Sequence, residues 1–189
     1  MADINLNTPE LNKYTEAVEF NAKRKNDFMF NNEGNEMALI VFRSIFRNAT
    51  DSIQIVANNL NNEVTNHSEY ISALDSFLSK SKTKVEILLS SHDAEADSSK
   101  IFQLLAEYSD KAFVRIIQDG RTFKDNKGRV IHFCVADKHM YRMEYDINNR
   151  KAECNFNNIK ECKMLSKLFY SVYNNSQYSK SVLLERCND

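Results

Sequence analysis

The sequence predicts an α/β fold in which helices pack on a mixed sheet. Apolar runs of strand length alternate with helical patterns across residues 52–118, and near-continuous apolar strands of this kind are typical of parallel pairing with both faces buried. Three further strand-like runs follow from residue 130 and are separated by short turns, which predicts an antiparallel meander. We therefore expect a sheet that is parallel in its first half and antiparallel near the C-terminus, with helices on both faces.

Length and charge limit the class of protein. With 189 residues, of which 42% are hydrophobic, the chain can form one domain with a full core. Its 25 lysines and arginines nearly balance 26 acidic residues, so any binding to nucleic acid must come from a local patch. The first ten residues lack an export signal, and no run of about 18 apolar residues occurs. We expect a cytoplasmic protein that does not bind membranes.

The cysteines and histidines do not form a metal signature. Cysteines occur at positions 134, 154, 162 and 187 without paired spacing, which is typical of reduced thiols. His132 and His139 lie in the same half of the chain, but a structural zinc site needs four converging ligands, and no CxxC spacing is present. We expect no metal, no cofactor, and buried thiols that act as small hydrophobic side chains.

The chain divides into three predicted parts. Residues 1–35 are expected to form an N-terminal helix or arm, because Thr8 followed by Pro9 is a typical helix start. Residues 36–176 are expected to form the main domain. Residues 177–189 are expected to form a C-terminal tail, frayed or folded as a short helix.

Helices are predicted where apolar residues recur at helical spacing. Asn66 with Glu69 three residues later has the form of a capping box, which places a helix start at Asn66. The apolar stripe of the helix at 36–48 is so wide that it predicts burial on two sides. The predicted helices cover residues 8–25, 36–48, 66–78, 98–108 and 159–174. The predicted strands cover residues 52–57, 84–90, 112–118, 130–136, 140–145 and 151–156.

The strand at 130–136 is the main candidate for a functional site. With a strand period of two, Val130, His132, Cys134 and Ala136 share one face, so His132 is the only ionisable group on that face. One interpretation is a core histidine satisfied by hydrogen bonds. The other is a histidine that binds phosphate or acts as a general acid or base, because imidazole titrates near neutral pH.

The same stretch, with Asp137 at its end, resembles the HxKxxxxD motif of the phospholipase D superfamily. In that family the His attacks phosphorus, the Lys binds phosphoryl oxygens, the Asp orients the His, and an Asn follows on the next strand. Aligned on Asp137, the resemblance puts Val130 in the nucleophile place, His132 in the Lys place and Asn155 in the Asn place. It implies one phospholipase D-like lobe with a degenerate motif, because valine has no lone pair to form a phosphoenzyme.

The resemblance names His132, Asp137 and Asn155 as catalytic candidates, in a site that is degenerate. Asp137 is explained equally well as a turn former before Lys138.

The loop at residues 119–129 is the second candidate for ligand binding. It contains two of the three glycines and several basic residues, and Arg or Lys beside exposed amides suits phosphate oxygens. A solvated hairpin loop explains the same charges. The ligand-binding candidates are Arg121, Lys124, Lys127, Arg129 and, on the following strand, Arg142.

Three functions follow as hypotheses. The leading one is a degenerate phospholipase D-like binding or assembly module that contacts nucleic acid or a phosphorylated ligand. The superfamily builds its site across two lobes, so the resemblance also implies a homodimer or a related partner chain. The alternatives are a phosphodiesterase or nuclease that uses His132, and a nucleotide-sensing regulatory module. The resemblance places relatives among prokaryotic nucleases and defence effectors, which is an analogy of fold.

Overall fold

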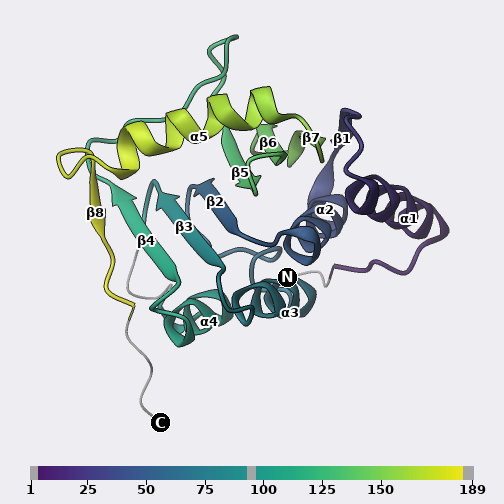
Figure 1. Cartoon of the computed structure of the whole chain (residues 1–189), viewed down its shortest axis with the longest axis horizontal. Coiled ribbons are helices and arrows are strands. Elements are labelled where there is room, and N and C mark those ends of the chain that lie inside the picture. Colours follow the sequence, from purple (N-terminus) through teal and green to yellow (C-terminus); the bar gives the residue numbers. More distant parts are fainter. Residues whose placement is uncertain (1–3, 93–96, 185–189) are drawn as a thin grey trace.

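The structure, a computed structural model, describes residues 4–92 and 97–184 (Figure 1). These residues form one mixed sheet with helices packed on it. The helices are α1 (Pro9–Arg24), α2 (Gly34–Asn48), α3 (Ser68–Leu78), α4 (Lys100–Glu107) and α5 (Ile159–Tyr173). The strands are β1 (Phe30–Asn32), β2 (Ser52–Ala57), β3 (Lys84–Leu89), β4 (Ala112–Ile117), β5 (His132–Ala136), β6 (Met140–Asp146), β7 (Lys151–Asn155) and β8 (Ser179–Ser181).

The sheet confirms the predicted change from parallel to antiparallel pairing. Its strand order is β1-β7-β6-β5-β2-β3-β4-β8. Strands β2, β3 and β4 pair in parallel, whereas β5, β6 and β7 form the antiparallel meander, and β5 joins the two halves by pairing antiparallel with β2. The two edge strands, β1 and β8, were not expected from the sequence. The segment predicted as a tail or short helix instead adds β8 to the sheet beside β4.

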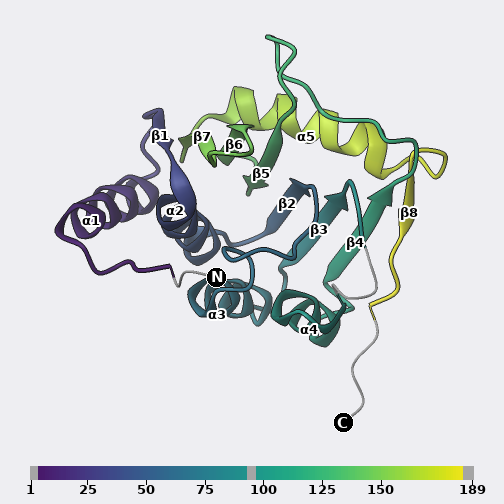
Figure 2. The ribbon, with the colours of Figure 1, turned by 180° about the vertical axis from the view of Figure 1, so that it is seen from behind.

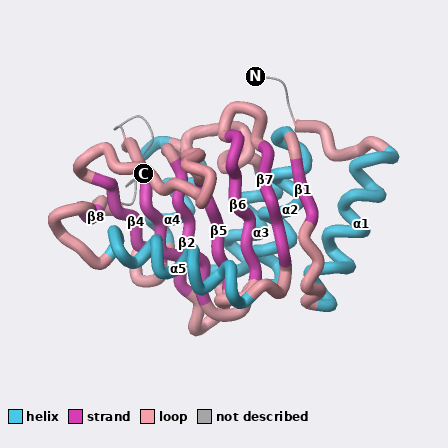
Figure 3. The backbone as a smooth tube through the Cα atoms, turned by 90° about the horizontal axis from the view of Figure 1, so that it is seen from above, coloured by secondary structure: helices cyan, strands magenta, loops and turns pink. Residues whose placement is uncertain are grey.

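Helices cover the two faces of the sheet unequally. Helices α2, α3 and α4 lie against one face, and α5 alone lies against the other (Figures 1 and 2). Seen from above, α5 runs across the strands (Figure 3). The larger hydrophobic core fills the space under α2, α3 and α4, and a smaller core lies beneath α5. Side chains of one strand therefore alternate between two separate cores.

The N-terminal helix packs on the domain through α2. Thr8 caps α1 by accepting a hydrogen bond from the backbone of Leu11, as the sequence predicts. Glu19 on α1 lies 3.5 Å from Arg43 and 3.2 Å from Arg47, both on α2. Among the described residues, none of the helices is long and apolar enough to cross a membrane.

The predicted capping box at the start of α3 is wrong. The N-cap is His67, whose Nδ1 accepts a hydrogen bond from the Glu69 backbone at 3.2 Å. Asn66 instead donates to the carbonyls of Leu60 and Asn62 and accepts a hydrogen bond from the backbone of Ile101. Its amide joins the loop before α3 to the first turn of α4, and this long-range use takes it away from the cap.

Candidate phosphate-binding cavity

Strand β5 begins at His132, two residues later than predicted. Val130 lies before it, in an isolated β-bridge with Lys124 that closes the turn at residues 125–129. The Val130 side chain is 38% exposed, so its alkyl group faces solvent rather than a core. The place that the phospholipase D resemblance assigns to a nucleophile is thus occupied by a hydrocarbon at the surface.

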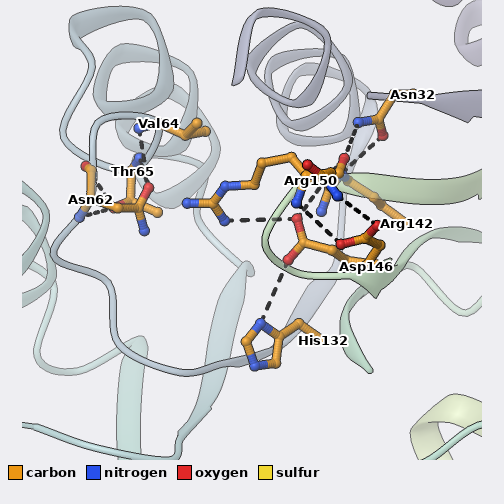
Figure 4. A network of polar contacts seen from close by, with 10 residues as sticks. Asn32, Asn62, Val64, Thr65, His132, Arg142, Asp146 and Arg150 are labelled. Atoms are coloured by element: carbon orange, nitrogen blue, oxygen red, sulfur yellow. Dashed lines mark hydrogen bonds and ion pairs between the residues drawn. The ribbon is translucent and has the colours of Figure 1, made fainter. Parts of the chain in front are cut away.

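His132 lies directly opposite Glu144 on β6. Its Nδ1 is 3.5 Å from Glu144 Oε2, and the Glu144 side chain is only 2% exposed (Figure 4). The His132 side chain is 14% exposed. A buried carboxylate beside one ring nitrogen fixes the orientation of an imidazole and leaves Nε2 for other partners. Within the described part of the chain, Nε2 of His132 has no hydrogen-bond partner.

Two arginines reach the same carboxylate. Arg142 Nη2 lies 3.0 Å from Glu144 Oε1, and Arg150 Nη1 lies 3.7 Å from that oxygen. Arg142 is buried and also donates from Nε to Asn32 Oδ1 at 3.1 Å, while its guanidinium lies 4.9 Å from the centre of the Phe42 ring. Figure 4 shows these groups converging from β1, β5, β6 and the β6–β7 turn. Arg142 is thus locked in place, whereas Arg150, with a side chain 27% exposed, can reach a ligand.

The pKa of Glu144 is lowered in this cluster. Burial acts to raise the pKa of the carboxyl group, but the hydrogen bond from His132 and the charges of Arg142 and Arg150 outweigh burial. Glu144 is therefore a carboxylate at neutral pH. Two guanidinium groups face one carboxylate, so the cluster is positively charged even when His132 is neutral.

The cluster lines a cavity of about 170 Å³. The cavity lies on the α2 and α3 side of the sheet, where β2 ends and its chain continues into the loop before α3, and ligands of α/β proteins commonly bind at such strand ends. Phe42 and Tyr70 form apolar walls, and Asn58, Asn59 and Asn62 provide amides. A cavity of this size with polar groups at one end can hold a small charged group and a few waters.

Asp137 lies at the other end of β5. Its carboxylate accepts hydrogen bonds from the backbone of Thr50 at 2.7 Å, of Asp51 at 2.9 Å and of Ser52 at 3.1 Å, and from the Thr50 hydroxyl at 2.9 Å. It is five positions along the chain from His132, or roughly 16 Å of extended strand. The structure does not bring Asp137 to His132; it brings Asp137 to the turn between α2 and β2.

Asn155 also lies away from the cavity. Its amide donates to Asp27 Oδ1 at 2.9 Å and accepts from the backbone of Asn157 at 2.7 Å. It pairs with Tyr141 on β6, whereas His132 pairs with Glu144, and these two positions on β6 are three residues apart, or about 10 Å. The side chain of Asn155 is buried and has partners elsewhere.

The basic residues of the 119–129 loop do not line the cavity either. Arg121 pairs with Asp119 and stacks on Tyr178, with 3.4 Å from its guanidinium carbon to the ring centre. Arg129 pairs with Asp125 at 2.6 Å. The tip of the loop extends beyond α5 (Figure 1), while Phe123 of the same loop is buried and packs against Phe133 of β5. Lys124 and Lys127 are exposed, and neither forms an ion pair with a described residue.

Sequence reasoning named His132 and Arg142 but missed Glu144, Arg150 and Asn32. Glu144 carried a usable signal, because Arg142 and Glu144 occupy alternate positions of a largely apolar strand and so share a face. Placing them beside His132 required the strand register, which residue patterns alone do not fix. Within the described residues, no group of His, Cys, Asp and Glu could hold a metal ion.

No protein-family model and no curated protein matches this sequence. Solved structures do share its fold. TrmBL2, an archaeal chromatin protein with a novel mode of DNA binding, is 13% identical over 92% of this chain and 62% of its own, with a TM-score of 0.57. NucT from Helicobacter pylori is 13% identical over 82% of this chain and 100% of its own, with a TM-score of 0.51.

Phosphatidylserine synthase from Haemophilus influenzae Rd KW20 is 11% identical over 83% of this chain, with a TM-score of 0.52. This chain spans 41% of the synthase and 62% of TrmBL2, so it corresponds to part of those larger chains. At these identities the likeness concerns the fold alone. The mixed sheet, the five helices and the likeness to NucT and the synthase show that the chain folds as a phospholipase D-like lobe.

Proposed function

We propose that this lobe is a binding module that holds a terminal phosphoryl group of a nucleic acid or phosphorylated ligand in the His132 cavity. The observation that supports it is that His132 and Arg150 both line one small cavity whose ionisable groups carry an excess of positive charge. Guanidinium N–H groups are strong donors to phosphate oxygens, and because Nδ1–H of His132 is directed at Glu144, Nε2 donates to a phosphate when the ring is protonated. The DNA-binding role described for TrmBL2 supports nucleic acid as the source of the phosphate.

Cavity size favours a phosphoryl group over a whole nucleotide. Pockets that enclose complete small ligands have volumes of roughly 300–1,000 Å³. The His132 cavity has a volume of about 170 Å³, which leaves the rest of a ligand outside. We infer that only the end of a chain or the phosphate of a larger molecule enters.

The absence of a nucleophile at Val130 supports binding without a phosphoenzyme. An alkyl side chain has no lone pair with which to attack phosphorus. Asp137 and Asn155 have hydrogen-bond partners elsewhere, so we assign them structural roles rather than catalytic ones.

A second candidate function is hydrolysis with His132 as a general base. It is supported by the contact between Nδ1 and Glu144, because a carboxylate that orients an imidazole is the arrangement used by hydrolytic enzymes to activate a nucleophile. In that case Nε2 would take a proton from water in the cavity. Hydrolysis of bis-p-nitrophenyl phosphate that disappears in His132→Gln would establish this function over binding alone.

We also propose that the lobe pairs with a second copy. The segment between α1 and β1 exposes two adjacent large apolar side chains, with Phe28 60% and Met29 55% exposed. Exposed apolar residues of this size are typical of association surfaces when they cluster. Light scattering that reports a monomer at micromolar concentration would contradict this assembly.

The test of the cavity compares two arginines of equal charge. Fluorescence anisotropy at fixed salt would measure binding of a single-stranded oligonucleotide with and without terminal phosphates. We expect Arg150→Met to remove the preference for the phosphorylated form, and Arg121→Met, whose guanidinium is held by Asp119, to retain it. An equal loss in both variants, or no preference in the unmodified protein, would overturn the proposal.

A further inference from the structure

A second groove lies on the opposite face of the sheet, beneath α5. Side chains of β2 and β3 alternate, so Ser52, Gln54 and Lys84 face α5 while their neighbours enter the larger core. Among the described residues, α5 is the only helix on this face (Figures 1 and 2). The groove has a volume of about 530 Å³. It is lined by Asp51, Ser52, Gln54, Lys84, Lys138, Ile159, Lys163, Ser166 and Tyr170.

The floor of this groove is polar and held in place by internal hydrogen bonds. Ser166 Oγ donates to Gln54 Oε1 at 2.7 Å. Tyr170 donates from its hydroxyl to Glu86 Oε2, also at 2.7 Å. Gln54 and Glu86 are each only 7% exposed, which is unusual for polar residues beneath a helix. A floor whose side chains are already oriented loses little entropy when a ligand binds.

The rim of the groove has an excess of positive charge. Lys84 already forms an ion pair, because its ammonium group lies 3.0 Å from Glu86 Oε2. Lys138 and Lys163 form no ion pair with any residue that the structure describes. Asp51 is the acidic residue on the rim, and it accepts a hydrogen bond from Ser52 at 3.3 Å. The rim therefore carries two lysines without an ion-pair partner among the described residues and one aspartate.

We propose that this groove binds a phosphorylated small molecule of mononucleotide size. The phosphate would lie between Lys138 and Lys163, and the polar body would contact Gln54, Ser166 and Tyr170. A volume of about 530 Å³ accommodates such a ligand. The exposed side chain of Ile159 supplies an apolar surface beside it. The groove and the His132 cavity lie on opposite faces of the sheet, so this proposal does not depend on the cavity.

Two matched double variants of α5 and its surroundings test the lysines. Isothermal titration calorimetry would measure the affinity for AMP in Lys138→Met with Lys163→Met, and in Lys160→Met with Lys167→Met. Lys160 and Lys167 are exposed on the same helix but do not line the groove. Loss of charge-assisted hydrogen bonds should weaken binding by about tenfold or more in the first variant. The second variant removes the same charge and should stay within about threefold of the unmodified protein.

If AMP binding weakens equally in both double variants, AMP is attracted by the positive charge of the whole face, and the proposed groove site is wrong. The absence of AMP binding to the unmodified protein would also contradict the proposal. Two further measurements locate the ligand. Ser166→Ala should weaken AMP binding several-fold while that of inorganic phosphate stays unchanged, and no change for AMP would contradict the assigned floor. In His132→Gln the titration should still show the AMP site that is lost in Lys138→Met with Lys163→Met, and the absence of that site would assign AMP to the cavity instead.

Discussion

The two ends of strand β5 use ionisable side chains in opposite ways. Directly after the last residue of the strand, the Asp137 carboxylate accepts four hydrogen bonds and joins the turn between α2 and β2 to the sheet. At the start of the strand, His132 contacts Glu144 through one ring nitrogen and lines a cavity. Both residues belong to the stretch that resembles a catalytic motif. The two residues differ in whether their hydrogen-bonding atoms are all used within the protein. A residue beside a cavity with an unused hydrogen-bonding atom is a candidate for ligand binding, whereas its position in a motif alone does not make it one.

The largest expected effect concerns the carboxylate beside His132. Glu144→Ala leaves the buried Arg142 without its ion-pair partner, and removing one partner of a buried pair costs about 3–5 kcal/mol of unfolding free energy. Urea denaturation followed by circular dichroism measures this loss. A change below about 1 kcal/mol would show that Asn32 and the backbone of Arg150 satisfy Arg142 by themselves.

A smaller loss of stability is expected at the other end of the strand. Asp137→Ala removes four hydrogen bonds to a charged acceptor, which we expect to lower the unfolding free energy by about 2–3 kcal/mol. Because Asp137 lies far from the cavity, the affinity for a phosphorylated oligonucleotide should be unchanged at temperatures where the variant is folded. Loss of binding without loss of stability would reverse the roles that we assign to the two ends.

His132→Gln should show the reverse pattern. Glutamine can still donate a hydrogen bond to Glu144, so the unfolding free energy should change by no more than about 1 kcal/mol. The preference for phosphorylated oligonucleotide should fall by about tenfold, because one donor to the phosphate is lost. Thermal denaturation and anisotropy measured on the same preparation separate the two effects. A fully retained preference would mean that His132 is only a core histidine.

Sequence patterns predicted much of this fold for identifiable physical reasons. The strands β2, β3 and β4 are near-continuous apolar runs separated by helices with one apolar face, so period and length identify them. The three-residue strands β1 and β8 have no such period, because they are defined by pairing with β7 and β4. Backbone hydrogen bonds to distant strands do not require a particular pattern of side chains, so the sequences of β1 and β8 do not reveal them.

The candidate site shows the same division between local and long-range information. His132 could be found because it is the ionisable residue of an apolar strand face. Its partner Glu144 is twelve residues away and meets it only through the register of β5 and β6. The motif alignment pointed instead to Asp137, which lies in the turn after β5, and to Asn155, which pairs with Tyr141 rather than with the Glu144 position. The spacing of a motif gives only the order of residues along the chain, whereas a site depends on which residues of neighbouring strands are paired in the sheet.

The smallest expected effect is a difference in acid sensitivity between the two ends of β5. Burial acts to raise the pKa of Asp137, but hydrogen bonds from the backbone of Asp51, Thr50 and Ser52 outweigh it, so its folded pKa lies below the unfolded value. A depressed folded pKa gives stability that is present above the unfolded pKa, near 4, and is lost as pH falls through the folded pKa.

Asp137→Asn should therefore lose stability at pH 7 but show a flatter decline between about pH 5 and pH 2 than the unmodified protein. Unfolding free energies from urea titrations at several pH values provide this comparison. Glu144 has a lowered pKa as well, so part of the acid sensitivity must remain in the Asp137 variant. A decline as steep as that of the unmodified protein would mean that the carboxylate at the cavity, and not the one at the turn, dominates the response of this fold to acid.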